Sequence, residues 1–363
     1  MAGDEQAHPW RLPGAVKGQD IKLGGKACGA LSAPAKVRLR RIVSKAPEVM
    51  VKITGRTRSH AGHLKRHLDY ITRNGRITAE TQDGQRITDR TKLRAVHDDW
   101  LLANAAQSRG RGGANAAQSV SIILSMQPGT PPDKVEAAAR TWARETFGGK
   151  YDWIMARHDD TGHPHVHVAV RAVGRDGLRL VPGPDDLQHW RERFARELRR
   201  LGVEAEATPR QARGHVPKAE RLPVKKIKQR GLEPRVQNAQ RQSSQREAHA
   251  PKPPQPRDWS RDIQARQEAI RRAYLTHADA LGRGDGADRQ LAHDIRRFVA
   301  DMPVPLTRRQ ALATELRHVL EQHPGRGTTP MSPLPGSAQV PRREKQSLAP
   351  EATPSVSLIK SRG

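Results

Sequence analysis

The segment that most constrains the fold is HDDTGHPHVHVAVRAV at residues 158–173, which joins four histidines to an apolar run. Successive side chains of a strand point to opposite faces. His165, His167 and Ala169 therefore share one face, and three valines share the other. The valine face suits burial under helices. We expect this strand to lie within a sheet, with its histidine face lining a site.

The neighbouring patterns predict the sheet around this strand. Strands are expected at 152–158, 164–173 and 178–181, and their connections are too short for crossover helices, so they must pair antiparallel. Alternation and apolar runs predict two earlier strands, at 48–55 and 119–126. Four helices are expected, at 59–75, 91–107, 128–149 and 184–202. The predicted fold class is α+β, with a central antiparallel sheet covered by helices.

Composition divides the chain into a folded part and basic, polar flanks. Residues 1–47 are expected to be a basic disordered segment, and 48–214 the folded domain. Residues 215–257 are basic and rich in Gln and Pro, which is typical of a linker. A helical segment is expected at 258–323, with helices near 259–282, 287–300 and 307–322. The Pro/Ser-rich remainder, 324–363, is expected to be a disordered tail.

The charge of the chain points to a polyanionic partner. The chain has 65 Lys and Arg residues and 38 Asp and Glu residues, which gives a formal net charge of +27. Nucleic acid is the usual polyanion, because each neutralised phosphate releases a counterion. A long apolar run or amphipathic anchor for a membrane is missing from the sequence, and a solvated basic surface is the plain alternative. A single cysteine, Cys28, excludes a disulfide framework within the chain, and we expect a cytoplasmic protein.

The histidines have the spacing of a metal site. His165 and His167, two positions apart on one strand face, lie about 6.5–7 Å apart at their Cα atoms, so their rings can converge. His158 ends the preceding strand, and an antiparallel return brings it alongside. Imidazole ligands suit Zn, Mn, Co or Ni. Asp159 and Asp160 could accept the other ring N–H groups. The alternative is a surface histidine cluster on a turn.

Tyr70 is one of only three tyrosines and falls on a polar helix face. On a helical wheel it lies about 120° from Leu64, together with His63, Arg66, Arg73 and Asn74. A phenol beside cations and metal-binding histidines indicates nucleophilic attack on a phosphodiester. The alternative is an exposed tyrosine that has no functional role.

Three stretches together resemble conjugative relaxases of the histidine-hydrophobe-histidine endonuclease superfamily. HLDYITRNGRI resembles the motif with the nucleophilic tyrosine, at Tyr70, and SIILSMQPGT the motif with a serine near the DNA backbone, at Ser125. HDDTGHPHVHVAV resembles the metal-binding motif. The similarity is greatest to mobilisation relaxases of the P class and to the T-DNA border endonuclease.

Each position of the family's metal-binding motif can be matched to a residue of this chain. The family's metal-binding histidines fall on His158, His165 and His167, and Asp160 matches a supporting acid. His163, a further ligand candidate, matches only the border-endonuclease branch. That branch often has an Asp where this chain has Gly162, so any role of that acid is absent here.

The resemblance implies a strand-specific transesterification at a plasmid transfer origin. The tyrosine takes the 5′-phosphate of single-stranded DNA, and a divalent metal assists, with Mg or Mn expected and Zn, Co or Ni open. Arg66, Arg73, Arg109 and Arg111 are candidate DNA contacts. Accessory mobilisation proteins and type IV coupling or secretion proteins are the implied partners, and passage into the recipient cell with the DNA is left open. The alternatives are a rolling-circle replication initiator of the same superfamily and a non-enzymatic basic DNA-binding protein.

Overall fold

Six strands form one antiparallel sheet in the order β1-β4-β6-β5-β2-β3. The computed structural model describes residues 31–57, 61–107, 116–214, 220, 222–249 and 258–322. The strands span β1 Met50–Thr57, β2 Ala79–Thr81, β3 Arg86–Ile87, β4 Ser119–Ser125, β5 Trp153–His158 and β6 His165–Arg171. The predicted α+β class and antiparallel sheet are confirmed, with the histidine strand β6 between β4 and β5.

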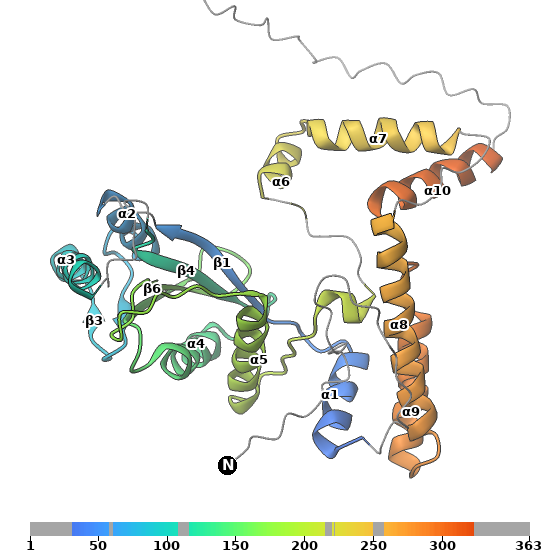
Figure 1. The fold of residues 1–363 in the computed structure, drawn as a ribbon, viewed down its shortest axis with the longest axis horizontal. Helices are drawn as coiled ribbons and strands as arrows, with labels where there is room; N and C mark the ends of the chain where they lie inside the picture. The colour runs from blue at the N-terminus through green and yellow to red at the C-terminus, as the bar shows by residue number, and fades with distance from the viewer. Residues whose placement is uncertain are drawn as a thin grey trace, which may run out of the picture.

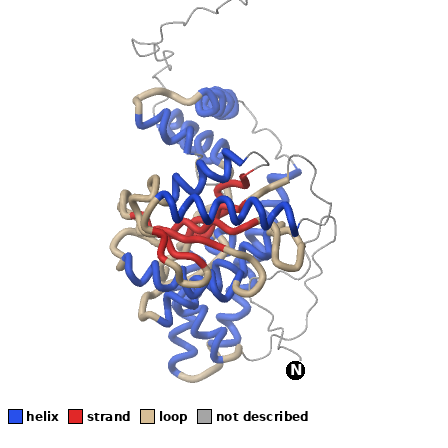
Figure 2. Tube along the Cα trace, turned by 90° about the vertical axis from the view of Figure 1, so that its left-hand side faces the viewer, coloured by secondary structure: helices blue, strands red, loops and turns tan. Residues whose placement is uncertain are grey.

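Helices cover both faces of the sheet (Figures 1 and 2). Those of the sheet domain are α2 Ala61–Ile71, α3 Arg90–Gln107, α4 Pro132–Phe147 and α5 Pro184–Arg200. One core joins α4 and α5 to the valine face of β6, and a second joins α2 and α3 to the opposite face, through Ala169. The alternation of β6 therefore separates an apolar face from the face that carries the histidines.

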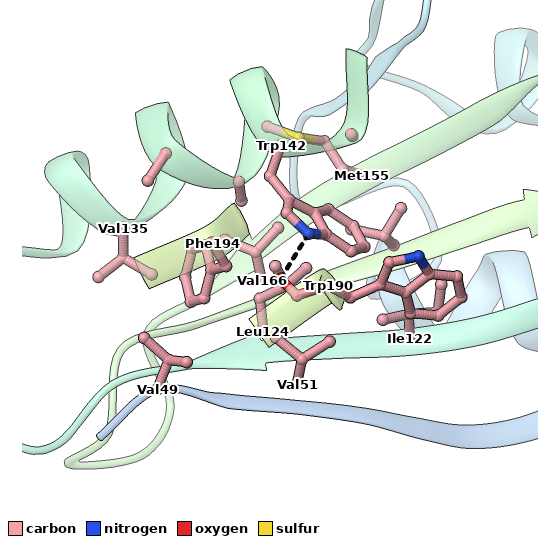
Figure 3. Packing of buried hydrophobic residues seen from close by; sticks show 14 of the residues in the cluster. Val49, Val51, Ile122, Leu124, Val135, Trp142, Met155, Val166, Trp190 and Phe194 are labelled. Carbon is pink, nitrogen blue, oxygen red and sulfur yellow. Dashed lines mark hydrogen bonds between the residues drawn. The ribbon is translucent and has the colours of Figure 1, made fainter. Parts of the chain in front are cut away.

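The larger core is organised around aromatic side chains (Figure 3). Trp142 of α4 is fully buried, and its ring meets those of Phe147 and Trp190 edge-on at 5.4 and 5.8 Å between centroids. The indole N–H of Trp142 donates to the Trp190 carbonyl at 2.9 Å, so the polar atom of this ring is satisfied inside the core. This contact fixes α4 against α5 beneath the sheet.

The C-terminal helices form a second body beside the sheet domain. They are α6 Leu222–Gln229, α7 Arg235–Ala248, α8 Asp258–Leu281, α9 Gly286–Ala300 and α10 Arg308–Gln322. The last three match the predicted helical segment. A short 3-10 helix, η1 Arg210–Arg213, precedes them, and the buried Tyr274 of α8 donates to its Ala212 carbonyl at 3.0 Å. None of the helices in the described ranges combines the length and apolar character needed to cross a membrane.

Two flanking segments are more structured than expected. Residues 1–47 were expected to lack order, but the described part contains α1 Ala33–Val43, whose Leu39 and Ile42 are buried against α8 and α9. The residues that cover Leu39 and Ile42 lie almost 250 positions later in the chain, so the local sequence does not reveal this packing. Within the expected linker, α7 packs on α10, where Ser244 Oγ donates to the Arg309 carbonyl at 3.1 Å. The division at residues 214 and 215 stays a prediction, and the tail from 324 lies outside the described residues.

The predicted strand at 178–181 is wrong. The structure has only an isolated bridge there, between Val173 and Arg179. Leu178 and Val181 are 57% and 72% exposed, and Leu180 alone of these apolar side chains packs against the core, so burial favours a full strand only weakly.

We predict that Trp142→Ala lowers the free energy of unfolding of the sheet domain by about 3–5 kcal/mol, because a buried ring and its hydrogen bond are lost together. Urea unfolding followed by circular dichroism measures the change. Leu102→Ala, at a position that is 71% exposed on α3, serves as the control and should stay within about 0.5 kcal/mol of wild type. Equal midpoints for the two variants would contradict the assigned core.

Candidate active site

Strand pairing brings three histidines onto one face. His158 ends β5 and pairs with His165 at the start of β6, while His167 lies two residues further on. All three side chains are buried, and their ring centroids are 4.3–5.4 Å apart. One ring nitrogen from each lies within 4.8 Å of the others, which would let them hold one metal ion. The predicted ligands His158, His165 and His167 are thus brought together.

Main-chain carbonyls orient two of these rings. His158 Nε2 lies 2.7 Å from the carbonyl oxygen of Ile71, and His165 Nδ1 lies 2.9 Å from that of His163. A carbonyl can only accept, so these nitrogens carry the protons. The lone pairs then lie on His165 Nε2 and on His158 Nδ1, which is 3.4 Å from Arg73 Nη2 in the metal-free site. The sequence predicted that Asp159 and Asp160 would do this. They instead pair with Arg157 and Arg73, because the carbonyls already occupy the ring N–H groups.

Burial favours the neutral, metal-binding form of His158 and His167. Desolvation, and after it the charges of the neighbouring histidines, lowers the pKa of His167 to about 3. Desolvation also lowers the pKa of His158. Neutral imidazole is the form that ligates a metal, so the site is prepared for one at neutral pH.

Tyr70 stands at the open side of the histidine cluster. Its ring lies 5.5 Å from that of His167 and 6.1 Å from that of His158, centroid to centroid. The side chain is 54% exposed, so a large substrate can reach it. The other two tyrosines, Tyr151 and Tyr274, are buried in separate cores. Tyr70 is therefore the one tyrosine of the chain that both meets the histidines and faces solvent.

A left-handed turn at the end of α2 positions Arg73. Arg73, Asn74 and Gly75 all have positive φ, of 52°, 59° and 78°. A Cβ on Gly75 would lie 3.1 Å from the backbone of Asp89 and Arg90, so glycine is needed there for space as well as conformation. Held this way, the guanidinium of Arg73 lies 5.5 Å from the Tyr70 ring centroid, pairs with Asp160 and stands 3.4 Å from His158 Nδ1.

His67 is a site residue that the sequence analysis missed. It precedes Tyr70 by three residues, so it lies one turn earlier on α2, and its Nδ1 is 3.4 Å from Ser121 Oγ on β4. Burial lowers its pKa to about 4, and its charge would disfavour protonation of His167. The spacing of three residues from Tyr70 was the signal that could have identified it.

The remaining predicted residues fall into three groups. Ser125 is buried and pairs with His165 across β4 and β6, so its side chain shares the histidine face. His163 lies outside the three-histidine cluster, with Nδ1 3.2 Å from the Met126 carbonyl, and Arg66 donates back to Gly62 on its own helix. Arg109 and Arg111 lie outside the described residues.

A cavity of about 420 Å³ adjoins the histidine cluster. Its charged lining consists of three arginines and three carboxylates, together with His158: Arg73, Arg86, Arg157, Glu136, Asp159 and Asp160. Arg157 is already paired with carboxylates, so Arg73, 5.5 Å from the Tyr70 ring centroid, is the guanidinium that suits a nucleotide phosphate next to the tyrosine.

Comparison with known proteins gives a match over the sheet domain. Residues 70–202 match a relaxase family model described as MobA/VirD2-like, nuclease domain. The segment begins at Tyr70 and includes the three histidines. T-DNA border endonucleases VirD2 from Rhizobium radiobacter, Agrobacterium fabrum and Rhizobium rhizogenes are each 28% identical over 163 residues, covering 40% of this chain. These matches confirm the predicted resemblance to relaxases similar to VirD2.

The match covers only part of each relative. It spans 38%, 36% and 37% of the three VirD2 proteins, respectively, well under half of their length. A solved structure described as "Molecular Basis of Vancomycin Resistance Transfer in Staphylococcus aureus" aligns with 45% of this chain and 98% of its own, at 14% identity and a TM-score of 0.31.

We predict that acid destabilises the metal-free protein partly through His67 and His167. Their folded-state pKa values lie below the ordinary 6.5, so between pH 6.5 and about 4 the unfolded chain binds more protons than the folded one. The free energy of unfolding should therefore fall as the pH is lowered through this range, by up to about 1.4 kcal/mol per pH unit for each histidine.

Urea unfolding with a chelator at pH 7.5, 6 and 5 measures this dependence. His67→Gln should reduce the slope relative to wild type. Equal slopes for wild type and His67→Gln would show that burial does not hold His67 neutral.

Proposed function

We propose that this chain, similar to the nuclease domain of MobA/VirD2-like relaxases over residues 70–202, nicks single-stranded DNA with Tyr70 as the nucleophile. The observation that carries the proposal is the convergence of an exposed tyrosine with a buried three-histidine cluster, with rings 5.5 and 6.1 Å apart. The residues come from two elements, α2 and the β5–β6 pair, that are distant in sequence. A purely structural role for the histidines would not require a solvent-facing phenol beside them.

The proposed reaction is a transesterification. The phenol oxygen of Tyr70 forms a bond to phosphorus as its proton leaves, and the bond from phosphorus to the 3′-oxygen breaks. The departing 3′-oxygen takes up a proton and leaves as a hydroxyl, while the 5′-phosphate stays on the tyrosine. One phosphate ester replaces another, so the reverse reaction can rejoin the strand.

Arg73 and Asp160 support this chemistry in different ways. The guanidinium of Arg73, beside the Tyr70 ring and His158, can hold a non-bridging oxygen of the phosphate through charged hydrogen bonds. Asp160 pairs with Arg73 and lies 3.9 Å from His165 Nε2. We therefore assign Asp160 as a positioning residue that acts through Arg73.

The three histidines fit a divalent metal. The three imidazoles are buried and offer nitrogen ligands, and main-chain carbonyls fix the tautomers of two of them. The candidate ions are Mg, Mn, Zn, Co and Ni. A bound metal would withdraw negative charge from the phosphate oxygens.

The biological task we propose is initiation of DNA transfer. The substrate would be single-stranded DNA at a transfer origin, and accessory mobilisation and type IV coupling proteins would be the partners. A rolling-circle initiator would use the same reaction, so only the DNA that is cleaved separates the two tasks. Mapping the labelled 5′ end on origin DNA makes that distinction.

We predict that Tyr70→Phe abolishes the covalent protein–DNA adduct, lowering its yield at least about a hundredfold, because no nucleophilic oxygen remains. Labelled oligonucleotides from the host plasmid, incubated with Mn or Mg and run on a denaturing gel, report the adduct. Oligonucleotide affinity should remain near wild type, since the ring is retained. An adduct on the variant would mean that another residue attacks.

We predict that His167→Ala lowers metal affinity and adduct formation together, each by at least about tenfold, because one of three ligands is lost. Calorimetric titration with Mn and the adduct assay measure the two effects. His163→Ala is the matched control, a histidine of the same segment outside the cluster, and should bind metal like wild type. Undiminished cleavage by the wild type in a chelator would argue against any metal.

A further inference from the structure

A second charged cavity lies on the side of the sheet opposite to Tyr70. It has a volume of about 340 Å³ and lies between α1 and α5, which Figure 1 shows beside each other. α5 packs on the valine face of β6, whereas Tyr70 and the histidines are on the other face. Charged and polar side chains line it: Arg38, Arg41, His189, Glu192, Arg193, Arg196, Arg199 and Glu206.

The two carboxylates of this cavity are already engaged. The buried Glu206 accepts from Arg41 Nε at 2.7 Å and lies 3.3 Å from Arg38 Nε. Glu192 accepts from Arg38 Nη2 at 3.2 Å and from Gln188 Nε2 at 3.0 Å. These two carboxylates pair with the arginines of α1, and Glu206 also attracts Arg199 of α5, so five arginines share two carboxylates in the lining.

The arginines of α5 supply the surplus charge. Arg196 pairs with Glu145 and Glu197 outside the cavity. Arg193 donates to the Glu145 carbonyl at 2.6 Å and lies 4.0 Å from the Glu145 carboxylate. Arg199 donates to the Ala205 carbonyl at 2.7 Å and makes no ion pair with a carboxylate of the described residues. Burial, and after it the charge of Arg41, lowers the pKa of Arg199. Glu206 offsets part of this effect, but Arg38, Arg41 and Arg196 also act on Arg199, so a further anion would relieve the repulsion between these cations.

We propose that this cavity binds backbone phosphates of the DNA strand at a distance from the cleavage site. Guanidinium forks match phosphate oxygens in pairs, and phosphate contacts position a strand without reading its sequence. The cavity volume lies within the range of ligand sites. DNA is favoured over an acidic protein segment because the proposed substrate carries a phosphate at every nucleotide. The inference rests on the proposed function, and it adds a second anchoring point on the far side of the sheet.

The test compares two neighbouring arginines of α5. Arg199→Gln removes a lining cation, and Arg200→Gln removes a 60% exposed one that pairs with Glu145 and Glu197 outside the cavity. Fluorescence anisotropy measures binding of the full-length chain to oligonucleotides lengthened stepwise on either side of the nick, at several KCl concentrations. Arg199→Gln should weaken binding of the long oligonucleotides by about three- to tenfold and reduce the salt slope by about 0.7 for each phosphate lost.

Short oligonucleotides separate this proposal from the proposed function. They should bind both variants alike and should form the Tyr70 adduct at the wild-type rate. Arg193→Gln, which removes a second lining guanidinium, should reproduce the loss on long oligonucleotides, and this guards against a folding defect in one variant. If Arg199→Gln and Arg193→Gln both bind oligonucleotides of every length as tightly as Arg200→Gln does, the proposal is overturned. That result would also be obtained if an acidic protein, and not DNA, fills the cavity. Failure of the wild type to form an adduct would overturn only the nicking function.

Discussion

The hydrogen bond from His158 Nε2 to the Ile71 carbonyl is the contact on which the arrangement of the active site depends. Ile71 ends α2, where the last carbonyls of a helix have no partner within it. By taking that carbonyl, the ring of His158 ties the end of the tyrosine helix to β5 and fixes which of its nitrogens stays free. Its net contribution to stability is only about 1 kcal/mol. Its larger effect is geometric, because Tyr70 lies one residue away on the same helix turn.

Side-chain periodicity predicted the part of the site that strands build. The alternation of His165, Val166, His167 and Val168 fixed both faces of β6, and short connections required the antiparallel return that brings His158 into the cluster. The exposed setting of Tyr70 followed from the helical wheel. These inferences succeeded because strand and helix periods act over a few residues and depend little on the rest of the chain.

What the sequence could not predict depends on main-chain groups and distant partners. The carbonyls of Ile71 and His163 hold the rings in place of Asp159 and Asp160, and every residue has a carbonyl, so no pattern marks these two. The left-handed turn that places Arg73 rests on space limits set by the start of α3. The strand expected at 178–181 does not form, because Leu178 and Val181 stay exposed, and local alternation cannot reveal which side chains another layer covers.

The position of α1 sets an order of assembly for the chain. This helix is among the first described residues, yet Leu39 and Ile42 are covered by α8 and α9, and Lys36 pairs with Asp288, 252 positions later. During synthesis the sheet domain can close once residues up to about 214 have emerged, whereas the apolar side of α1 stays uncovered until α9 is made. Helix α1 is thus among the last of the described elements to reach its final packing, and it joins the two bodies only when both exist.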